Sequence, residues 1–284
     1  MKYSHTKWIP DESQLNTILT LYKTKSVLYI AKQFGKDRSV IIRILKENNI
    51  HIKNLSESHR LPVDEYFFDK IDTEEKAYWL GFIYADGYIT KCNNHEVFGI
   101  KLNIKDLDHL VKFKKAIKSD HKIIKETINS PYGVVNACAI SIRNKVFVDC
   151  LQDKGVFYNK SKILQPPPLN KIPNELLSHF IRGYYDGDGS VYQCKAKKDN
   201  WKPYGNISFL GTKNFLTWIL DNLKNVCLTT ANIYKYKDKD VWEIKIGGNN
   251  NFLNLYNYLY DNATVYLDRK KEKADSIKID AQTI

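Results

Sequence analysis

The first fifty residues carry apolar side chains three or four positions apart in three short segments, and polar turns separate these segments. Asp11 or Ser13 can cap the first segment, and Ser26 can cap the second. Gly35 lies in the turn before a third segment, which runs from Arg38 to Asn48. The pattern predicts a small all-α unit of three helices over residues 1–55.

The rest of the chain repeats one order of elements twice. In each copy a helix ends at Asp-Gly, and two strands, a helix, two more strands and a last helix follow. Residues 56–73 are predicted to be a linker, and three consecutive prolines stiffen a connector at 161–173. We therefore predict an α+β protein, with residues 74–160 and 174–284 as two αββαββα halves of a domain-sized duplication.

Each half opens with a nonapeptide of the same kind. The two nonapeptides are Trp79-Leu80-Gly81-Phe82-Ile83-Tyr84-Ala85-Asp86-Gly87 and Ile181-Arg182-Gly183-Tyr184-Tyr185-Asp186-Gly187-Asp188-Gly189. Small residues recur four positions apart, as Gly81 and Ala85 and as Gly183 and Gly187, so each pair shares one face of a helix. Faces without large side chains let two helix backbones approach closely.

Asp86 and Asp188 are the acids that the two helices would bring together. The glycine after each of them is typical of a helix C-terminus, where φ is often positive. Both carboxylates would lie at the negative ends of helix dipoles, which is unfavourable for an anion. Crowded like charges partly neutralise unless a cation is present. The pattern therefore indicates a divalent metal.

The charge of the chain narrows its class of partner. A net charge of +12, spread along the sequence, favours a polyanion, most often nucleic acid. The three-helix unit is then interpreted as a helix-turn-helix with Arg38, Ser39 and Arg43 as DNA contacts, although an ordinary three-helix cap has the same spacing.

Neither a signal peptide nor an apolar stretch of ~18 residues is visible in the sequence. We therefore expect no membrane contact and no secretion. The expected location is intracellular: the cytoplasm of a bacterium or of a phage-infected cell, or an organelle.

The paired nonapeptides resemble the motif of the LAGLIDADG homing endonucleases, over roughly residues 72–265. The first copy keeps Gly81, Ile83, Ala85, Asp86 and Gly87, and the second keeps Gly183, Asp186, Asp188 and Gly189. The departures are Tyr84 in the first copy and Arg182 and Gly187 in the second.

This resemblance implies a monomer that is an internal pseudo-dimer. The motif helices would pack at its centre, and two β-sheets would form a saddle on double-stranded DNA. It also implies Mg²⁺-dependent cleavage of both strands at one long site, with Ca²⁺ or Mn²⁺ as possible substitutes. Asp86 and Asp188 would be catalytic and would bind the metal together with the carbonyls of Ala85 and Gly187, because Mg²⁺ prefers oxygen ligands.

Lys245 best matches the basic residue that these endonucleases place near the scissile phosphate. Its counterpart in the first half is Ser141, so the two active sites are predicted to be unequal. Lys101, Lys105 and Lys213 remain alternatives.

Basic and amide side chains alternate with apolar ones along several predicted strands, and a basic loop follows one of them. Solvated strand faces have the same pattern. The predicted DNA contacts outside the three-helix unit are Lys91, Lys101, Asn103, Gln193, Lys195, Lys197, Lys198, Lys235 and Lys237.

Two other classes of function compete with a nuclease. The same scaffold could be a non-cleaving binder of DNA or RNA, such as a transcriptional regulator or an intron maturase. An enzyme that uses paired acids on a carbohydrate or a small molecule is disfavoured, because the charge and the strand faces suit a polyanion.

Overall fold

The computed structural model describes residues 7–22, 25–52, 61–93, 95–130, 133–194, 203–224, 226–227, 231–236 and 241–282. They belong to two compact units, residues 1–60 and 61–284. Four predicted DNA contacts, Lys195, Lys197, Lys198 and Lys237, lie outside the described residues.

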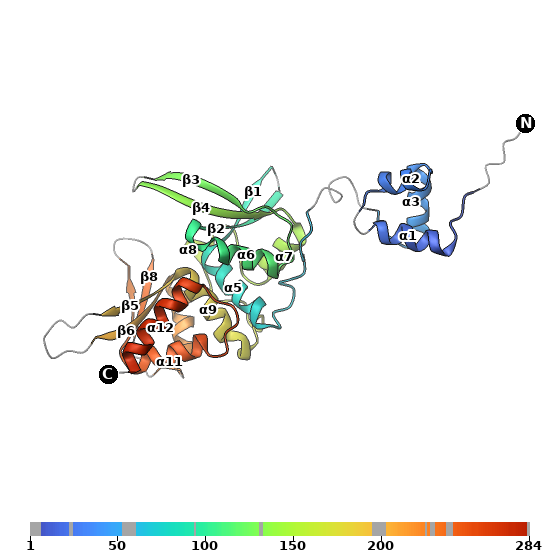
Figure 1. The fold of residues 1–284 in the computed structure, drawn as a ribbon. Helices are drawn as coiled ribbons and strands as arrows, with labels where there is room; N and C mark the ends of the chain where they lie inside the picture. The colour runs from blue at the N-terminus through green and yellow to red at the C-terminus, as the bar shows by residue number, and fades with distance from the viewer. Residues whose placement is uncertain are drawn as a thin grey trace, which may run out of the picture. The chain divides into compact units, whose positions relative to one another are not determined.

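The small unit contains the three predicted helices: α1 (Glu12–Tyr22), α2 (Val27–Gln33) and α3 (Arg38–Glu47) (Figure 1). The Asp11 carboxylate accepts a hydrogen bond from the Gln14 amide, and the Ser26 hydroxyl accepts one from the Tyr29 amide, so both predicted caps form. Gly35 adopts φ +58° in the turn before α3. This three-helix unit is built around its own core of Ile18, Tyr22, Val27, Ile30, Ala31, Ile41, Ile44 and Leu45.

The large unit confirms the duplicated αββαββα order. The first half comprises α5 (Glu74–Asp86), β1 (Gly87–Cys92), β2 (His95–Asn103), the 3₁₀ turn η1 (Ile104–Asp106), α6 (Leu107–Ala116), β3 (Ile124–Ser130), β4 (Gly133–Ile142) and α7 (Lys145–Asp153). After the turn η2 (Asn174–Leu176), the second half comprises α9 (Leu177–Asp188), β5 (Gly189–Cys194), β6 (Tyr204–Gly211), α10 (Lys213–Leu223), β7 (Ile233–Lys235), β8 (Trp242–Gly247) and α11 (Asn249–Tyr260). A further helix follows the last predicted helix of each half, α8 (Lys160–Ile163) and α12 (Asp268–Gln282), and the sequence pattern did not predict either.

The two sheets have the same antiparallel topology, β1-β2-β4-β3 and β5-β6-β8-β7 (Figure 1). In the first sheet, Gly99 pairs with Ser141, and in the second, Ser208 pairs with Lys245. The register therefore confirms that Ser141 and Lys245 occupy equivalent positions.

One hydrophobic core joins both halves, and α5 and α9 pack against each other within it. Phe67 and Phe68 are buried in the same core, so the large unit begins within the segment predicted to be a linker. The inner face of each sheet is apolar and packs on helices, as Phe98 of β2 does on the rings of Phe113 and Phe147. The opposite face, which carries Lys101, Ser141 and Lys245, is called the outer face below.

One local expectation is wrong. Gly87 and Gly189 have φ of −74° and −95°, so positive φ is not the reason for glycine there. Space is the reason, because a Cβ on Gly87 would lie 2.9 Å from the Ile83 carbonyl oxygen. Asp106 lies at the N-cap position of α6 but makes no side-chain cap hydrogen bond, because its carboxylate accepts two hydrogen bonds from Arg269, at 2.6 and 2.9 Å.

Candidate active site and nucleic-acid interface

Asp86 and Asp188 are the last residues of α5 and α9, and both are half-buried. The small residues of the motif bring these two helix ends together. A Cβ on Gly187 would lie 2.2 Å from the Ala85 Cβ and 3.1 Å from Asp86 Oδ2. The Asp86 carboxylate therefore lies against the last turn of α9, as the nonapeptide pattern predicts.

The electrostatics of the pair follow from this crowding. Burial, followed by the negative charge of Asp188, raises the pKa of Asp86 to about 6. Burial also raises the pKa of Asp188, against the opposing effect of the Lys160 and Lys270 ammonium groups. An added cation would stabilise both ionised carboxylates.

Two buried lysines at this site were missed by the sequence analysis. Lys160 Nζ donates to the Ala85 carbonyl oxygen at 2.6 Å. Lys270 Nζ donates to the carbonyl oxygens of three residues, Tyr185, Asp186 and Gly189, at 2.7–2.8 Å. Burial lowers the pKa of each lysine to about 8, whereas the carboxylates nearby raise it. Each lysine lies in the helix that follows the last predicted helix of its half. This equivalent position in the two halves is the feature of the sequence that could have revealed them.

The two lysines differ in how many of their N–H groups donate hydrogen bonds to the protein. An ammonium group has three N–H donors. All three donors of Lys270 are directed at carbonyls around the end of α9. Among the described residues, Lys160 Nζ has one hydrogen-bond acceptor, so two of its donors remain available beside the carboxylates.

The two carboxylates are the side chains at this site that could coordinate a divalent metal. In the described part of the chain, no group of three or more His, Cys, Asp and Glu side chains could hold a metal ion. Asp86 and Asp188 offer carboxylate oxygens whose ionisation a cation would favour, so these two residues fit. The Ala85 carbonyl fits less well, because it already accepts the Lys160 ammonium.

The departures from the motif have structural roles. Tyr84 donates its hydroxyl proton to the Lys154 carbonyl. Its counterpart Asp186 is fully buried and accepts hydrogen bonds from the Tyr78 and Tyr260 hydroxyls and the Leu267 amide.

Arg182, which is also fully buried, donates to Glu74 of α5 at 2.7 Å and to the Leu259 carbonyl of α11 at 2.8 Å. These contacts connect the motif helix of the second half to the first half and to the end of its own half.

Lys245 lies on the outer face of the second sheet, opposite Ser208, with its side chain half exposed. Its ammonium is 3.0 Å from a Glu243 carboxylate oxygen, and this contact raises the pKa of Lys245. The cations that lower the pKa of Asp188 are Lys160 and Lys270. A catalytic role for Lys245 therefore stays a prediction, whereas Lys160 and Lys270 are the lysines whose charges act on both carboxylates.

The strand register sorts the predicted DNA contacts by face. Lys101 and Asn103 pair with Ala139 and Ala137 on the outer face of the first sheet. Lys101 is 2.7 Å from Glu126 on the same face. The remaining three described strand residues, Lys91, Gln193 and Lys235, point to the opposite side and share it with Ile89, Val191 and Ile233. These three therefore do not share the outer face with Lys101 and Asn103, and their contact with DNA stays a prediction.

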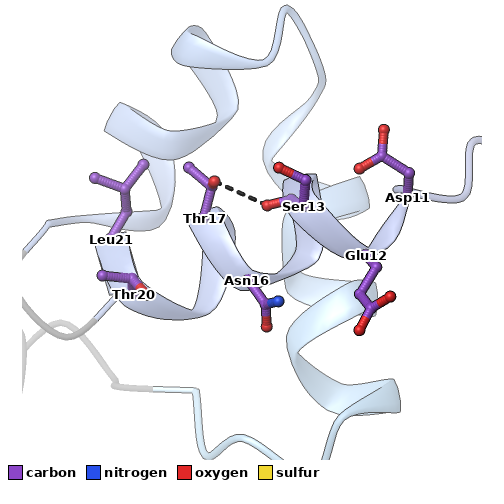
Figure 2. A pocket seen from close by; sticks show the side chains of 7 residues that line it. All are labelled: Asp11, Glu12, Ser13, Asn16, Thr17, Thr20 and Leu21. Carbon is purple, nitrogen blue, oxygen red and sulfur yellow. Dashed lines mark hydrogen bonds between the residues drawn. The ribbon is translucent and has the colours of Figure 1, made fainter.

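In the small unit, Arg38 and Ser39 are exposed at the start of α3. Arg43 is half-buried, because it donates to the Trp8 carbonyl and lies 3.9 Å from Glu47. Figure 2 shows a shallow recess beside α1 that is lined by seven residues, with Thr17 donating to the Ser13 carbonyl at 2.9 Å. The recess includes Asp11, Glu12, Asn16, Thr20 and Leu21. Two carboxylates make this side of α1 a poor surface for phosphate, which favours the start of α3.

Within the described residues, no helix is both long and apolar enough to cross a membrane. No protein-family model matches the chain. An uncharacterized protein of Methanocaldococcus jannaschii is 29% identical over 194 residues, which are 66% of this chain and 64% of that protein. A DNA polymerase of Acanthamoeba polyphaga mimivirus is 28% identical over 137 residues, 46% of this chain and 8% of that protein. The chain thus spans less than two thirds of either relative.

Solved structures give a more specific likeness. The LAGLIDADG meganuclease I-AabMI bound to uncleaved DNA aligns with a TM-score of 0.51 and 12% identity, over 75% of this chain and 92% of that one. The meganuclease I-SmaMI bound to uncleavable DNA aligns with a TM-score of 0.51 and 13% identity, over 72% and 90%. The chain has the duplicated fold of the LAGLIDADG homing endonucleases.

Proposed function

We propose that this protein is a site-specific endonuclease that hydrolyses both strands of double-stranded DNA at one long target site. The observation that carries the proposal is the pair Asp86 and Asp188, which two packed helices deliver to one half-buried place. A structural role does not require two carboxylates held where burial raises the pKa of both and the charge of Asp188 raises that of Asp86 further. The DNA-bound state of similarly folded proteins supports a DNA partner.

Asp86 and Asp188 are the residues that would hold a divalent metal, Mg²⁺ by preference and Ca²⁺ or Mn²⁺ as substitutes. When bound, such a metal activates water and neutralises charge on the phosphate oxygens. The chain itself orients the two acids through the α5–α9 contact. Within the described part of the chain the Lys160 ammonium has one acceptor, the Ala85 carbonyl, so two N–H donors are left for a phosphate oxygen or the attacking water.

The outer faces of the two sheets would bind the DNA, and the three-helix unit would extend the contact. The internal duplication gives one carboxylate to each strand, so the chain would act as a monomer inside a cell.

The test is cleavage of a supercoiled plasmid library that carries random inserts, with Mg²⁺, with Mn²⁺ and with a chelator. We expect linear product with either metal and none with the chelator. Asp86→Asn and Asp188→Asn should abolish linear product and spare DNA binding. The matched control Asp149→Asn changes an exposed aspartate that pairs with Lys145, and it should cut normally.

Stable, sequence-specific binding without nicking under any metal would replace the proposal with a non-cleaving derivative of the scaffold. Double-strand cleavage by Asp86→Asn at the normal rate would refute the assignment of the acids.

A further inference from the structure

The outer faces of the two sheets differ in chemistry, although their strands are equivalent. In the first sheet, the rows beyond Ser141 pair Ala139 with Ile124, and Ala137 with Glu126. The next row pairs Val135 with Ile128. Directly paired residues point to the same side of a sheet, so these side chains form one stripe along β3 and β4.

The stripe is aliphatic and open to solvent. Ile124 is 60% exposed and Val135 is 40% exposed, and Ile128 is half-buried. One ion pair crosses the stripe: Lys101 Nζ lies 2.7 Å from Glu126 Oε1, so the two charges neutralise each other. The alanines at 137 and 139 project only a methyl group above the sheet, so β4 places no large side chain between the ends of the stripe. We call Ile124, Ile128 and Val135 the aliphatic stripe.

The equivalent rows of the second sheet carry groups that form hydrogen bonds. Lys245 is the counterpart of Ser141, and the next row pairs Glu243 with Leu210 and with Tyr234. The Lys245 ammonium lies 3.0 Å from a Glu243 carboxylate oxygen, and Tyr234 is 54% exposed. The two halves therefore present different groups at equivalent positions of their sheets.

The aliphatic stripe is continuous with the candidate active site. β1 begins directly after Asp86, and its Tyr88 ring covers Gly99, which pairs with Ser141. From Ser141 to Val135, β4 runs six residues, about 20 Å. That distance equals about six base pairs of DNA. On a duplex held against the outer face, the stripe would therefore lie within about six base pairs of Ser141.

We propose that the first half recognises thymine C5-methyl groups in the major groove of its half-site through the aliphatic stripe, whereas the second half reads its half-site through hydrogen bonds. The inference rests on the proposed binding of DNA. Its chemical basis is that the thymine methyl is the apolar group that base edges offer in the major groove. Isoleucine and valine cannot form hydrogen bonds with any other base edge.

The test starts from a target selected from a random duplex library by the full chain in a chelator, so that cleavage plays no part. Each thymine of the selected site is then replaced by deoxyuridine, which lacks only the methyl group. We expect affinity to fall about fourfold for each contacted methyl, the effect of losing one buried carbon. The sensitive positions should fall in one half-site.

Adjacent valines of β4 provide a matched pair of variants. Val135→Thr replaces a methyl of the stripe by a hydroxyl of nearly equal size. Val134→Thr makes the same change on the other side of the strand, where the side chain is 68% exposed. Val135→Thr should weaken binding and remove the deoxyuridine effect at its position, and Val134→Thr should do neither.

The outcomes separate this inference from the proposed function. Failure of the chain to bind any duplex would remove both. Specific binding with equal deoxyuridine effects in the two half-sites, or equal effects of the two valine variants, would overturn only the recognition of thymine. A change of oligomeric state in Val135→Thr, measured by analytical ultracentrifugation without DNA, would assign the stripe to a second copy of the chain instead.

Discussion

Gly81 and Gly183 each lie directly against the backbone of the other's helix. A Cβ on Gly81 would be 1.9 Å from the Phe180 carbonyl oxygen, and one on Gly183 would be 2.0 Å from the Tyr78 carbonyl oxygen. No side-chain rearrangement relieves a clash with a carbonyl, so the helices could accept a methyl group here only by moving apart. The position of both carboxylates depends on this separation.

We expect Gly183→Ala to destabilise the large unit by about 3 kcal/mol, the upper end for an overpacked core. Gly187→Ala also clashes, but with the Ala85 Cβ at 2.2 Å. The double variant Ala85→Gly/Gly187→Ala should therefore regain most of the lost stability in urea denaturation. Ala85→Gly should not rescue Gly183→Ala, and equal rescue of both would contradict the geometry.

Asp86→Asn should make the metal-free protein more stable while it abolishes cleavage. The pKa of Asp86 is about 6 in the folded state, above its ordinary value of 3.8, so folding favours the protonated form. Stability is then lost as pH rises from about 4 to about 6, and it stays lower above that range. An asparagine removes this penalty, so at pH 8 the thermal midpoint should rise by a few degrees, about 2–4 °C per kcal/mol for a chain of this size. Asp149→Asn, which loses an exposed ion pair, should not raise it.

Lys160→Met and Lys270→Met should have different effects. Lys270→Met removes the hydrogen-bond donor of three backbone carbonyls, so it should lower the unfolding free energy by about 3 kcal/mol or more. Lys160→Met removes the hydrogen-bond donor of one carbonyl, so the loss of stability should be smaller, and cleavage should slow about a hundredfold. Equal losses of stability would contradict the division of roles.

Cleavage of the two strands should respond unequally to Lys245→Met. The equivalent residue of the first half is the uncharged Ser141, so Ser141→Ala should leave both rates unchanged. If Lys245 stabilises charge at one phosphate, its loss slows that strand about a hundredfold and a nicked intermediate accumulates. Time courses with each strand end-labelled separately measure this, and equal slowing of both strands would count against it.

His109 should make the fold acid-sensitive. It is buried among Tyr78, Trp79 and Phe82, and burial lowers its pKa to about 3. The unfolded chain protonates this histidine near pH 6.5 and the folded chain does not, so stability falls as pH decreases from 6.5 toward 3. Its share is about 1.4 kcal/mol per pH unit. The buried aspartates have the opposite dependence, so the measurement compares variants: His109→Gln should flatten the unfolding free energy between pH 7 and pH 5. The exposed control His95→Gln should leave the profile unchanged.

The sequence was sufficient for the order of elements and for the acid pair, because the nonapeptides and the strand alternation are local patterns. It was insufficient where the partner is distant in sequence. Asp106 has the local pattern of a cap, yet Arg269 binds it from 163 residues away. Lys160 lies in a helix of four residues and Lys270 in a largely charged one, so neither segment has an apolar period that reveals its position.

The Arg182–Glu74 pair has a consequence for exchanging parts between relatives. A fully buried arginine whose carboxylate partner lies on the other half leaves an uncompensated charge if either half is replaced alone. Chimaeras that join one half of this protein to a foreign half should therefore fold only when the donor supplies the matching residue of this ion pair. Whether two halves can be combined thus depends first on this buried ion pair between them, and only then on the DNA half-site that each half recognises.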